Sequence, residues 1–208
     1  MYYLVLDLEM TGLEPGWHEI IQIGAALYDE RWKPCGERYL TNVYPENEES
    51  YSLPALEVHG LTMEELEDAP MMNEVLPEFE NWILESMGKH PDRMSGRDKG
   101  QALRDTLICG QSVINDINFL KFAYREEHLK WPFSNTLVDL HTLSFYLFPL
   151  LEAAGQTVPR KRSLEAIAGF FGYERETDEH NALEDAVLTA KCLRELFRLR
   201  ERLTLAPA

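Results

Sequence analysis

Long apolar runs near the start of the chain predict β-strands. Residues 2–10 form the first run and residues 19–28 the second, while residues 37–44 alternate between polar and apolar side chains. All three segments contain β-branched or aromatic residues, which is typical of strands. Because the connections between them are short, we expect the three strands to pair as an antiparallel meander.

The pattern becomes helical after residue 60. Thr62 is expected to cap a short helix, with Glu65 completing a capping box. Asn73 is expected to cap a longer helix with one apolar face, in which Pro77 falls near the first turn, where proline is tolerated. Later segments alternate: strands are predicted at residues 107–110 and 136–138, and helices at residues 116–128, 140–148, 164–171 and beyond Asn181, with caps at Asp139, Ser163 and Asn181.

A meander followed by alternating strands and helices predicts an α/β fold, a mixed central sheet of three antiparallel strands and then parallel strands, flanked by helices. The length of 208 residues fits a single domain over residues 1–208. Residues 88–106 interrupt the pattern because they are polar, basic and rich in glycine. We expect a flexible loop or an insertion there.

Two acids stand in the first apolar run. Asp7 and Glu9 are two residues apart, so a strand directs both side chains to the same face. Like charges on a half-buried strand repel each other, and desolvation increases the cost of each charge. A bound divalent cation would remove both problems. The alternative is a strand end that frays into solvent with surface acids.

Three later segments add candidate chemistry. Asp116 follows a predicted strand, Asp139 follows the next one, and His180 precedes Asp185 by five residues near the last helix. Taken one at a time, each has a simpler interpretation: Asp116 as an acid at a helix N-terminus, Asp139 as a helix cap, and His180 as an exposed loop residue.

The charge balance limits the choice of partners. Acidic residues outnumber basic ones 36 to 20, giving a formal charge of −16. Such a surface does not attract a long tract of nucleic acid, so metal ions and local basic residues would have to offset the repulsion. The candidates are Lys89–Arg104 and Arg160–Arg162, each alternatively a solvated loop. The tail Arg194–Arg202 is interpreted as a solvated helix face or a homodimer contact.

Other features predict a cytoplasmic protein. Cys35, Cys109 and Cys192 are far apart and form no CxxC pair, so neither a zinc site nor a disulfide framework is indicated. The N-terminus has no basic region typical of a signal peptide, and no uncharged stretch of 18 residues predicts a membrane span.

In chain order, the acids form the pattern acid-x-acid-x-Thr-Gly, a mid-chain Asp, and His-x4-Asp. This order resembles the DEDDh-type 3′–5′ exonucleases, a group that includes replicative-polymerase proofreading subunits, RNase T and oligoribonuclease. The likeness extends from Leu4 to about Leu196. The segment Asp7–Leu13 is most similar to oligoribonuclease, whereas His59-Gly60-Leu61-Thr62 is closer to the proofreading and RNase T branches.

The resemblance implies a ribonuclease H-like fold and release of 5′-mononucleotides from single-stranded or frayed 3′ ends of DNA or RNA. Asp7, Glu9, Asp116 and Asp185 would hold two Mg²⁺ or Mn²⁺ ions, and His180 would take the proton from the attacking water. Asp7 would bridge both ions, Glu9 and Asp185 would complete the site that activates water, and Asp116 would serve the leaving group. The residues implied to contact the terminal nucleotide are Met10, Thr11, Gly12, Leu13 and His59.

The middle motif departs from the family pattern. Gln111-Ser112 stands where the group usually has His-Asn, and Asn115 stands where an aromatic residue usually precedes the Asp. Two alternatives therefore stay open. One is a non-catalytic nucleic-acid-binding module of the same fold, and the other is a phosphatase with Asp7 as its nucleophile.

Overall fold

Five strands and eight α-helices make up the part of the chain that the structure, a computed structural model, describes, residues 1–175 and 181–200. The strands are β1 (Tyr2–Met10), β2 (Ile20–Asp29), β3 (Pro34–Asn42), β4 (Thr106–Gly110) and β5 (Leu137–Asp139). The helices are α1 (Leu53–His59), α2 (Met63–Leu66), α3 (Met72–Ser86), α4 (Gly96–Arg104), α5 (Ile114–Glu126), α6 (Leu140–Ala153), α7 (Leu164–Phe170) and α8 (Ala182–Arg200).

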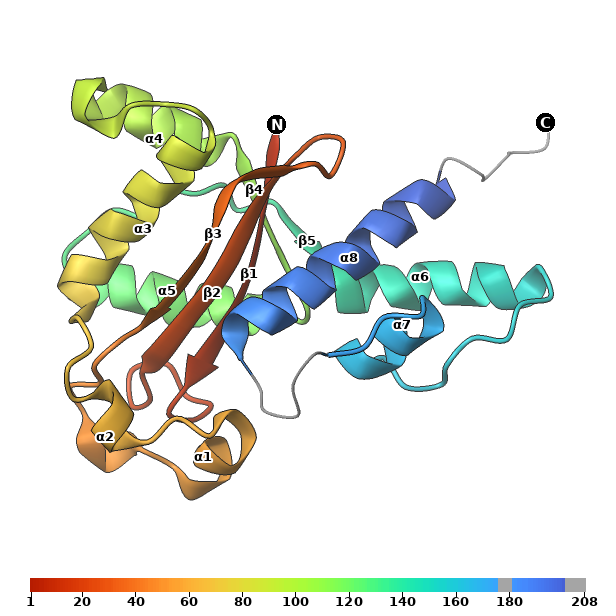
Figure 1. Ribbon diagram of the computed structural model, residues 1–208, viewed down its shortest axis with the longest axis horizontal. Helices are drawn as coiled ribbons and strands as arrows, with labels where there is room; N and C mark the ends of the chain where they lie inside the picture. Colours follow the sequence, from red (N-terminus) through yellow and green to blue (C-terminus); the bar gives the residue numbers. More distant parts are fainter. Residues whose placement is uncertain (176–180, 201–208) are drawn as a thin grey trace.

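The strands form one mixed sheet in the order β3-β2-β1-β4-β5 (Figure 1). β1 pairs antiparallel with β2, and β2 pairs antiparallel with β3. β4 pairs parallel with β1 on the other side, and β5 pairs parallel with β4. The predicted mixed sheet, an antiparallel meander followed by parallel strands, is therefore confirmed.

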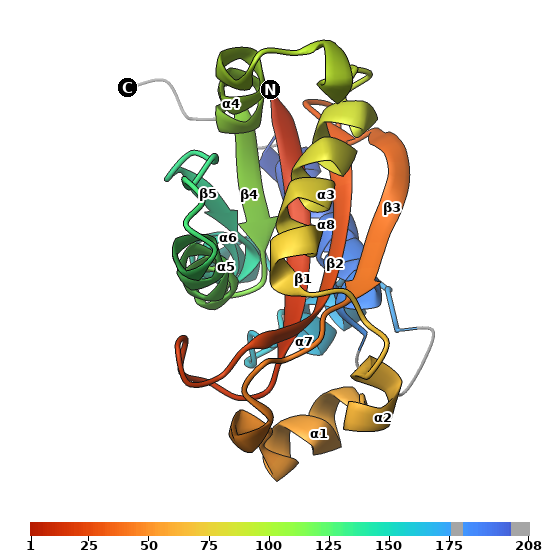
Figure 2. The ribbon, with the colours of Figure 1, turned by 90° about the vertical axis from the view of Figure 1, so that its left-hand side faces the viewer.

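The alternation of β1 divides the core into two layers. Leu4, Leu6 and Leu8 pack into the cluster under α3 and α5, while Tyr3 and Val5 pack into the cluster under α6, α7 and α8. Figure 2 shows α3 and α8 on opposite faces of the sheet. Side chains two apart on a strand share a face. Asp7 and Glu9 therefore continue the row of Tyr3 and Val5 toward the face that α8 covers.

Two residues of β2 bring the start of α8 against the sheet. Gly24 pairs with Asp7, and a Cβ atom added to it would lie 2.1 Å from backbone atoms of Ala182 and Leu183. Gln22 pairs with Glu9, and its Oε1 accepts a hydrogen bond from Ala182 N at 3.0 Å. Because Gly24 has no side chain, the start of α8 lies directly against β2. This contact is at the two positions of β2 that pair with Asp7 and Glu9.

Replacing Gly24 with Ala should lower the free energy of unfolding by about 1–3 kcal/mol, because the added methyl group forces α8 away from the sheet. Urea denaturation would measure the loss. Gly169→Ala is the matched control, since a Cβ atom there meets nothing within 4 Å. An unchanged midpoint for Gly24→Ala would show that the contact between α8 and β2 is not tight.

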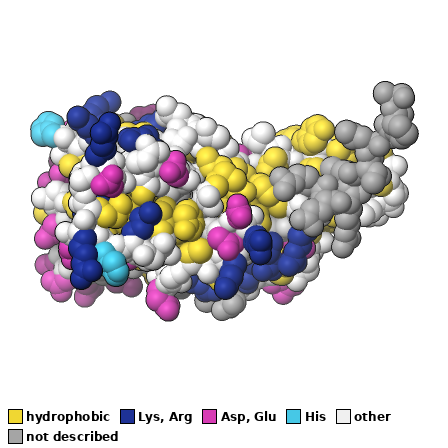
Figure 3. All heavy atoms as spheres, turned by 90° about the horizontal axis from the view of Figure 1, so that it is seen from above, with side chains coloured by type: hydrophobic (Ala, Val, Ile, Leu, Met, Phe, Trp, Pro, Cys, Tyr) yellow, Lys and Arg dark blue, Asp and Glu magenta, His cyan; other side chains and the backbone are white. Residues whose placement is uncertain are grey.

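The segment expected to be a loop contains a helix. Within residues 88–106, α4 begins after Ser95, whose hydroxyl accepts from Asp98 N at 3.2 Å and donates to Asp98 Oδ2 at 2.7 Å. Ala102 and Leu103 anchor the helix in the core. α4 lies at the end of the sheet where β1 begins, while Asp7 and Glu9 lie toward the other end (Figure 1). From the α4 end, basic and acidic side chains are interspersed rather than gathered (Figure 3).

Helix starts were mostly predicted correctly. The capping box of Thr62 and Glu65 is present, and Asp139 and Ser163 accept from the third residue of their helices. Asn181 Oδ1 accepts from Leu183 N and Glu184 N. The prediction for Asn73 was wrong: α3 begins at Met72, and Glu74 instead accepts from Met71 N at 3.2 Å. No helix within residues 1–175 and 181–200 has the length and apolar character needed to cross a bilayer.

Candidate active site

Three elements bring four acids to the same end of the sheet. Asp7 and Glu9 come from β1, Asp116 from the first turn of α5, and Asp185 from the first turn of α8. The ladder between β1 and β4 ends at the pair Val5–Cys109. Beyond it, the Leu8 N–H donates to Asp116 Oδ1 at 3.1 Å and fixes this carboxylate against β1.

The charges of these acids act on one another. The pKa of Asp7 is raised well above its ordinary value, first by desolvation and then by the carboxylates of Asp116, Glu9 and Asp185. The sequence-predicted acids are thus close enough to compete for protons. Such crowding is characteristic of a site that binds a cation or handles protons.

Glu9 and Asp116 have raised pKa values for the same reasons. Burial, followed by the charge of Asp185, raises the pKa of Glu9 to about 7. Burial also raises the pKa of Asp116 to about 7, although hydrogen bonds from its own backbone N–H and from Leu8 N oppose the shift. Both groups therefore hold protons in the folded protein at pH values where they would be ionised in the unfolded chain.

Arg175 supplies a positive charge at this site. Its Nε donates to Asp185 Oδ1 at 2.6 Å and its Nη2 to Asp185 Oδ2 at 2.8 Å, while Nη1 lies 2.7 Å from Glu165 Oε1. The guanidinium charge lowers the pKa of both Asp7 and Glu9, against the effect of burial. Arg175 was not among the residues predicted from the sequence. The only signal was a single basic residue in the acidic stretch from residue 174 to residue 179.

The four acids have the chemistry to bind a divalent cation, but their carboxylates are not arranged around a common ion position in this structure. Carboxylate oxygens are the ligands that Mg²⁺ and Mn²⁺ prefer. Across the described residues, no three acids, histidines or cysteines are oriented to bind one ion together. Asp185 pairs with Arg175, and Asp116 accepts the hydrogen bond from Leu8 N, so both carboxylates contact protein donors.

A cavity of about 580 Å³ opens beside Glu9. One side is lined by Met10 at the end of β1 and by Gly12 and Leu13 after it, and the other by residues of α1, including His59. Thr11 does not line this cavity. Its side chain is fully buried, and its Oγ1 accepts from Glu19 N at 3.0 Å and contacts Ser50 Oγ at 2.9 Å. The structure thus assigns Thr11 to the support of the loop rather than to the cavity wall.

His59 presents a buried hydrogen-bond donor beside this cavity. Its side chain is only 4% exposed, and its Nδ1 accepts from Leu61 N at 3.0 Å. Burial lowers the pKa of the ring, so the neutral form carries its proton on Nε2. Nε2 has no hydrogen-bond partner among the described residues. A buried donor of this kind favours a ligand that accepts a hydrogen bond.

The altered middle motif has structural contacts of its own. Gln111 Nε2 donates to Arg162 O at 2.7 Å, and Ser112 Oγ lies 3.2 Å from His141 Nδ1. Ser112 has a φ of 55°, which few residues other than glycine and asparagine adopt readily. The turn that contains Ser112 places Asp116 at the start of α5. The contact of Ser112 connects this turn to α6, and the hydrogen bond of Gln111 connects it to the loop before α7. His180, the expected general base, lies outside the described residues.

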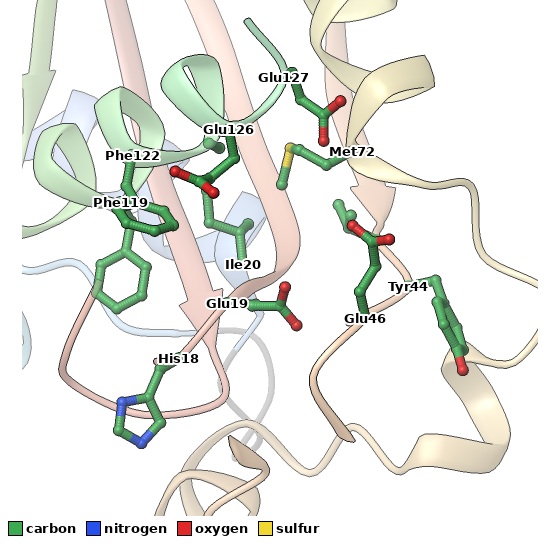
Figure 4. A pocket seen from close by; sticks show the side chains of 12 residues that line it. His18, Glu19, Ile20, Tyr44, Glu46, Met72, Phe119, Phe122, Glu126 and Glu127 are labelled. Carbon is green, nitrogen blue, oxygen red and sulfur yellow. The ribbon is translucent and has the colours of Figure 1, made fainter. Parts of the chain in front are cut away.

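A second cavity, of about 60 Å³, lies where the start of β2 meets α5. Glu19, Glu46, Glu126 and Glu127 direct carboxylates around it (Figure 4). Their negative charge would repel a phosphate group. The cavity beside Glu9 is therefore the better candidate for a nucleotide.

Replacing Glu9 with Gln should stabilise the metal-free protein at high pH and have little effect at low pH. The raised pKa means that wild-type stability falls as pH rises from about 4.5 to about 7, because the folded state binds the proton more tightly than the unfolded state. Gln avoids this loss, so the variant should gain roughly 3 kcal/mol relative to wild type by pH 8. Denaturation in EDTA between pH 4.5 and 8 would measure it. An equal difference at every pH would contradict the assigned pKa.

The chain is similar in sequence to known exonucleases and DNA polymerases. The family model for RNase T, described as Exonuclease, matches residues 4–91. The PolC-type DNA polymerase III of Thermotoga maritima is 28% identical over 202 residues, which are 97% of this chain and 12% of the polymerase. The chain therefore spans about one eighth of the length of that relative.

Solved structures share the fold. The nuclease domain of 3′hExo, a DEDDh family member bound to rAMP, has a TM-score of 0.72 at 18% identity, covering 99% of this chain and 96% of that one. Exonuclease I of E. coli in complex with a dT13 oligonucleotide has a TM-score of 0.76 at 16% identity, covering 97% of this chain and 43% of that one. The ribonuclease H-like fold and the resemblance to DEDDh-type exonucleases are thereby confirmed.

Proposed function

Because this chain resembles the DEDDh-type exonucleases in motif order, family match and fold, we propose that it forms a single metal-dependent 3′–5′ exonuclease domain. It would release 5′-mononucleotides from single-stranded or frayed ends of DNA or RNA. The observation that carries this proposal is the convergence of four acids beside a cavity large enough for a nucleotide.

Asp7, Glu9, Asp116 and Asp185 would hold two divalent cations, Mg²⁺ or Mn²⁺. Bound cations would offset the negative charge that develops on the attacking and leaving oxygens of the phosphodiester. The mutual repulsion of the four carboxylates and their hard oxygen atoms support this assignment. Asp185 would have to exchange its bond to Arg175 for the cation.

The cavity beside Glu9 would hold the terminal nucleotide. Met10 and Leu13 would contact the base with apolar surface, and backbone groups around Gly12 would approach the sugar. His59 would donate from Nε2, which has no partner among the described residues, to an oxygen of the nucleotide. His180 would take the proton from the attacking water, for which an ordinary imidazole pKa of about 6.5 is suitable.

The alternative of a non-catalytic nucleic-acid-binding module is less well supported. Burying Glu9 and Asp116 with raised pKa values costs stability, and a module that only binds has no use for acids that repel phosphate. The phosphatase alternative leaves Asp116 and Asp185 without a role.

The proposal is tested with one oligonucleotide in linear and circular form. We expect Mn²⁺ or Mg²⁺ to allow stepwise shortening of the 5′-labelled linear strand, with 5′-mononucleotides as products, and EDTA to stop it. The circular strand should stay intact because it has no 3′ end. Cleavage of the circle, or equal shortening in EDTA, would refute the proposal.

A further inference from the structure

One face of α6 is apolar and lies in solvent. The helix has the sequence LHTLSFYLFPLLEA, which is apolar on nearly every side, a composition typical of helices that are covered all round. Leu140, Leu147 and Phe148 are buried against the sheet. Phe145 and Tyr146, however, are 60% and 69% exposed. Neighbouring exposed aromatic side chains of this kind mark a binding surface.

A basic loop lies beside these rings. Arg162 folds back over Phe148 and Phe145, with its guanidinium 4.7 Å and 5.6 Å from the two ring centroids. Its Nη1 also donates to the carbonyl groups of Pro159 and Lys161. These contacts hold the loop against α6 and leave Arg160 and Lys161 exposed. Neither pairs with a carboxylate in the portion of the chain described by the structure.

The surface is linked to the acid cluster through the altered middle motif. Gln111 donates to Arg162 O, and Ser112 Oγ contacts His141, whose ring lies 5.1 Å from that of Phe145. Asp116 follows four residues after Ser112, in the first turn of α5. α6 also follows directly from the edge strand β5 (Figure 1). A contiguous set of contacts thus leads from the candidate active site to the exposed rings.

We propose that His141, Phe145, Tyr146, Arg160 and Lys161, here called the α6 platform, bind the single-stranded nucleic acid upstream of the 3′ end. This inference rests on the proposed function. Exposed rings offer stacking faces to successive bases, and adjacent cations contact the phosphates. The charge pattern selects this occupant: a run of three basic residues borders exposed aromatic rings in a chain of charge −16. Gln111 and Ser112 would position the platform.

The first experiment compares binding of a fluorescent 12-nucleotide strand in EDTA, where no hydrolysis is expected. Replacing both rings, Phe145→Ala with Tyr146→Ala, should weaken binding about tenfold or more, as loss of base stacking predicts. The double Leu variant keeps apolar surface without stacking faces and should lose nearly as much. Arg160→Ala with Lys161→Ala should weaken binding and reduce its salt dependence. Arg31→Ala with Lys33→Ala, which removes equal charge from exposed positions in the connection between β2 and β3, is the matched control.

The second experiment compares hydrolysis of a dinucleotide with that of the 12-nucleotide strand in Mn²⁺. We expect the ring variants to keep wild-type kcat/KM on the dinucleotide and to lose about tenfold on the long strand. Equal loss on both substrates, or no loss on the long strand, would overturn the platform. Unchanged binding accompanied by dissociation of a dimer in sedimentation would also overturn it and identify a contact between two copies.

The two proposals can fail separately. If wild-type protein hydrolyses neither substrate, the exonuclease proposal fails, while the binding experiment in EDTA still decides whether the platform holds nucleic acid. If hydrolysis is normal and the ring variants bind the long strand as well as wild type does, the platform fails alone. Circular dichroism and thermal unfolding of each variant would exclude a folding defect.

Discussion

Replacing Asp7 with Asn should lower the rate of mononucleotide release at least about a thousandfold, equivalent to about 4 kcal/mol of transition-state stabilisation. Asp7 lies at the centre of the acid cluster, where the charges of Asp116, Glu9 and Asp185 all act on it. Asn keeps the shape of the side chain but removes the charge that would hold a cation. Single-turnover hydrolysis of a labelled strand in Mn²⁺ measures the loss.

The same variant should be more stable than wild type in EDTA. The raised pKa of Asp7 means that its ionised form is held in the fold at a cost, and Asn carries no such charge. Mn²⁺ should raise the melting temperature of wild type and leave Asp7→Asn much less affected. Asp68→Asn, at an exposed position, is the matched control and should change neither activity nor the response to Mn²⁺. Wild-type hydrolysis by Asp7→Asn would disprove the assigned site.

Replacing His180 with Ala should slow hydrolysis about 10²–10⁴-fold, the range expected for removal of a general base. Binding of Mn²⁺, followed through the melting temperature, should be retained because His180 is not assigned as a ligand. The loss should be smaller at high pH, where hydroxide substitutes for the base, and added imidazole should restore part of the rate. His90→Ala is the control, since His90 is exposed and follows α3 rather than the acid cluster. Full activity of His180→Ala would show that another group takes the proton.

Local patterns predicted most of the sheet and two of the acids. The two-residue period of β1 was sufficient to infer that Asp7 and Glu9 share a face, and short connections were sufficient to infer the antiparallel meander. Capping at Thr62, Asp139 and Ser163 was predictable because those hydrogen bonds join residues three apart. Asp116 and Asp185 were found through family resemblance, since nothing local distinguishes them from ordinary acids in a first helical turn.

Some features were not predicted because contacts between distant residues, rather than local sequence patterns, stabilise them. α4 contains Gly96 and Gly100, which argue against a helix, yet the cap at Ser95 and the burial of Leu103 stabilise one. α1 was also overlooked, although Ser52 accepts from Ala55 N and Pro54 stands near the helix start. The pairing of Arg175 with Asp185 joins residues ten apart across a helix start, and no sequence period encodes it.

The bond between Arg175 and Asp185 has a consequence for how this protein is handled. The Arg175 guanidinium offsets part of the negative charge of the acid cluster, so the chain should fold without bound metal. Purification in EDTA should therefore yield native protein rather than aggregate. The metal-free protein can then be mixed with its substrate in advance, and hydrolysis can be initiated by adding Mn²⁺. Time-resolved measurement of each successive nucleotide release then becomes practical.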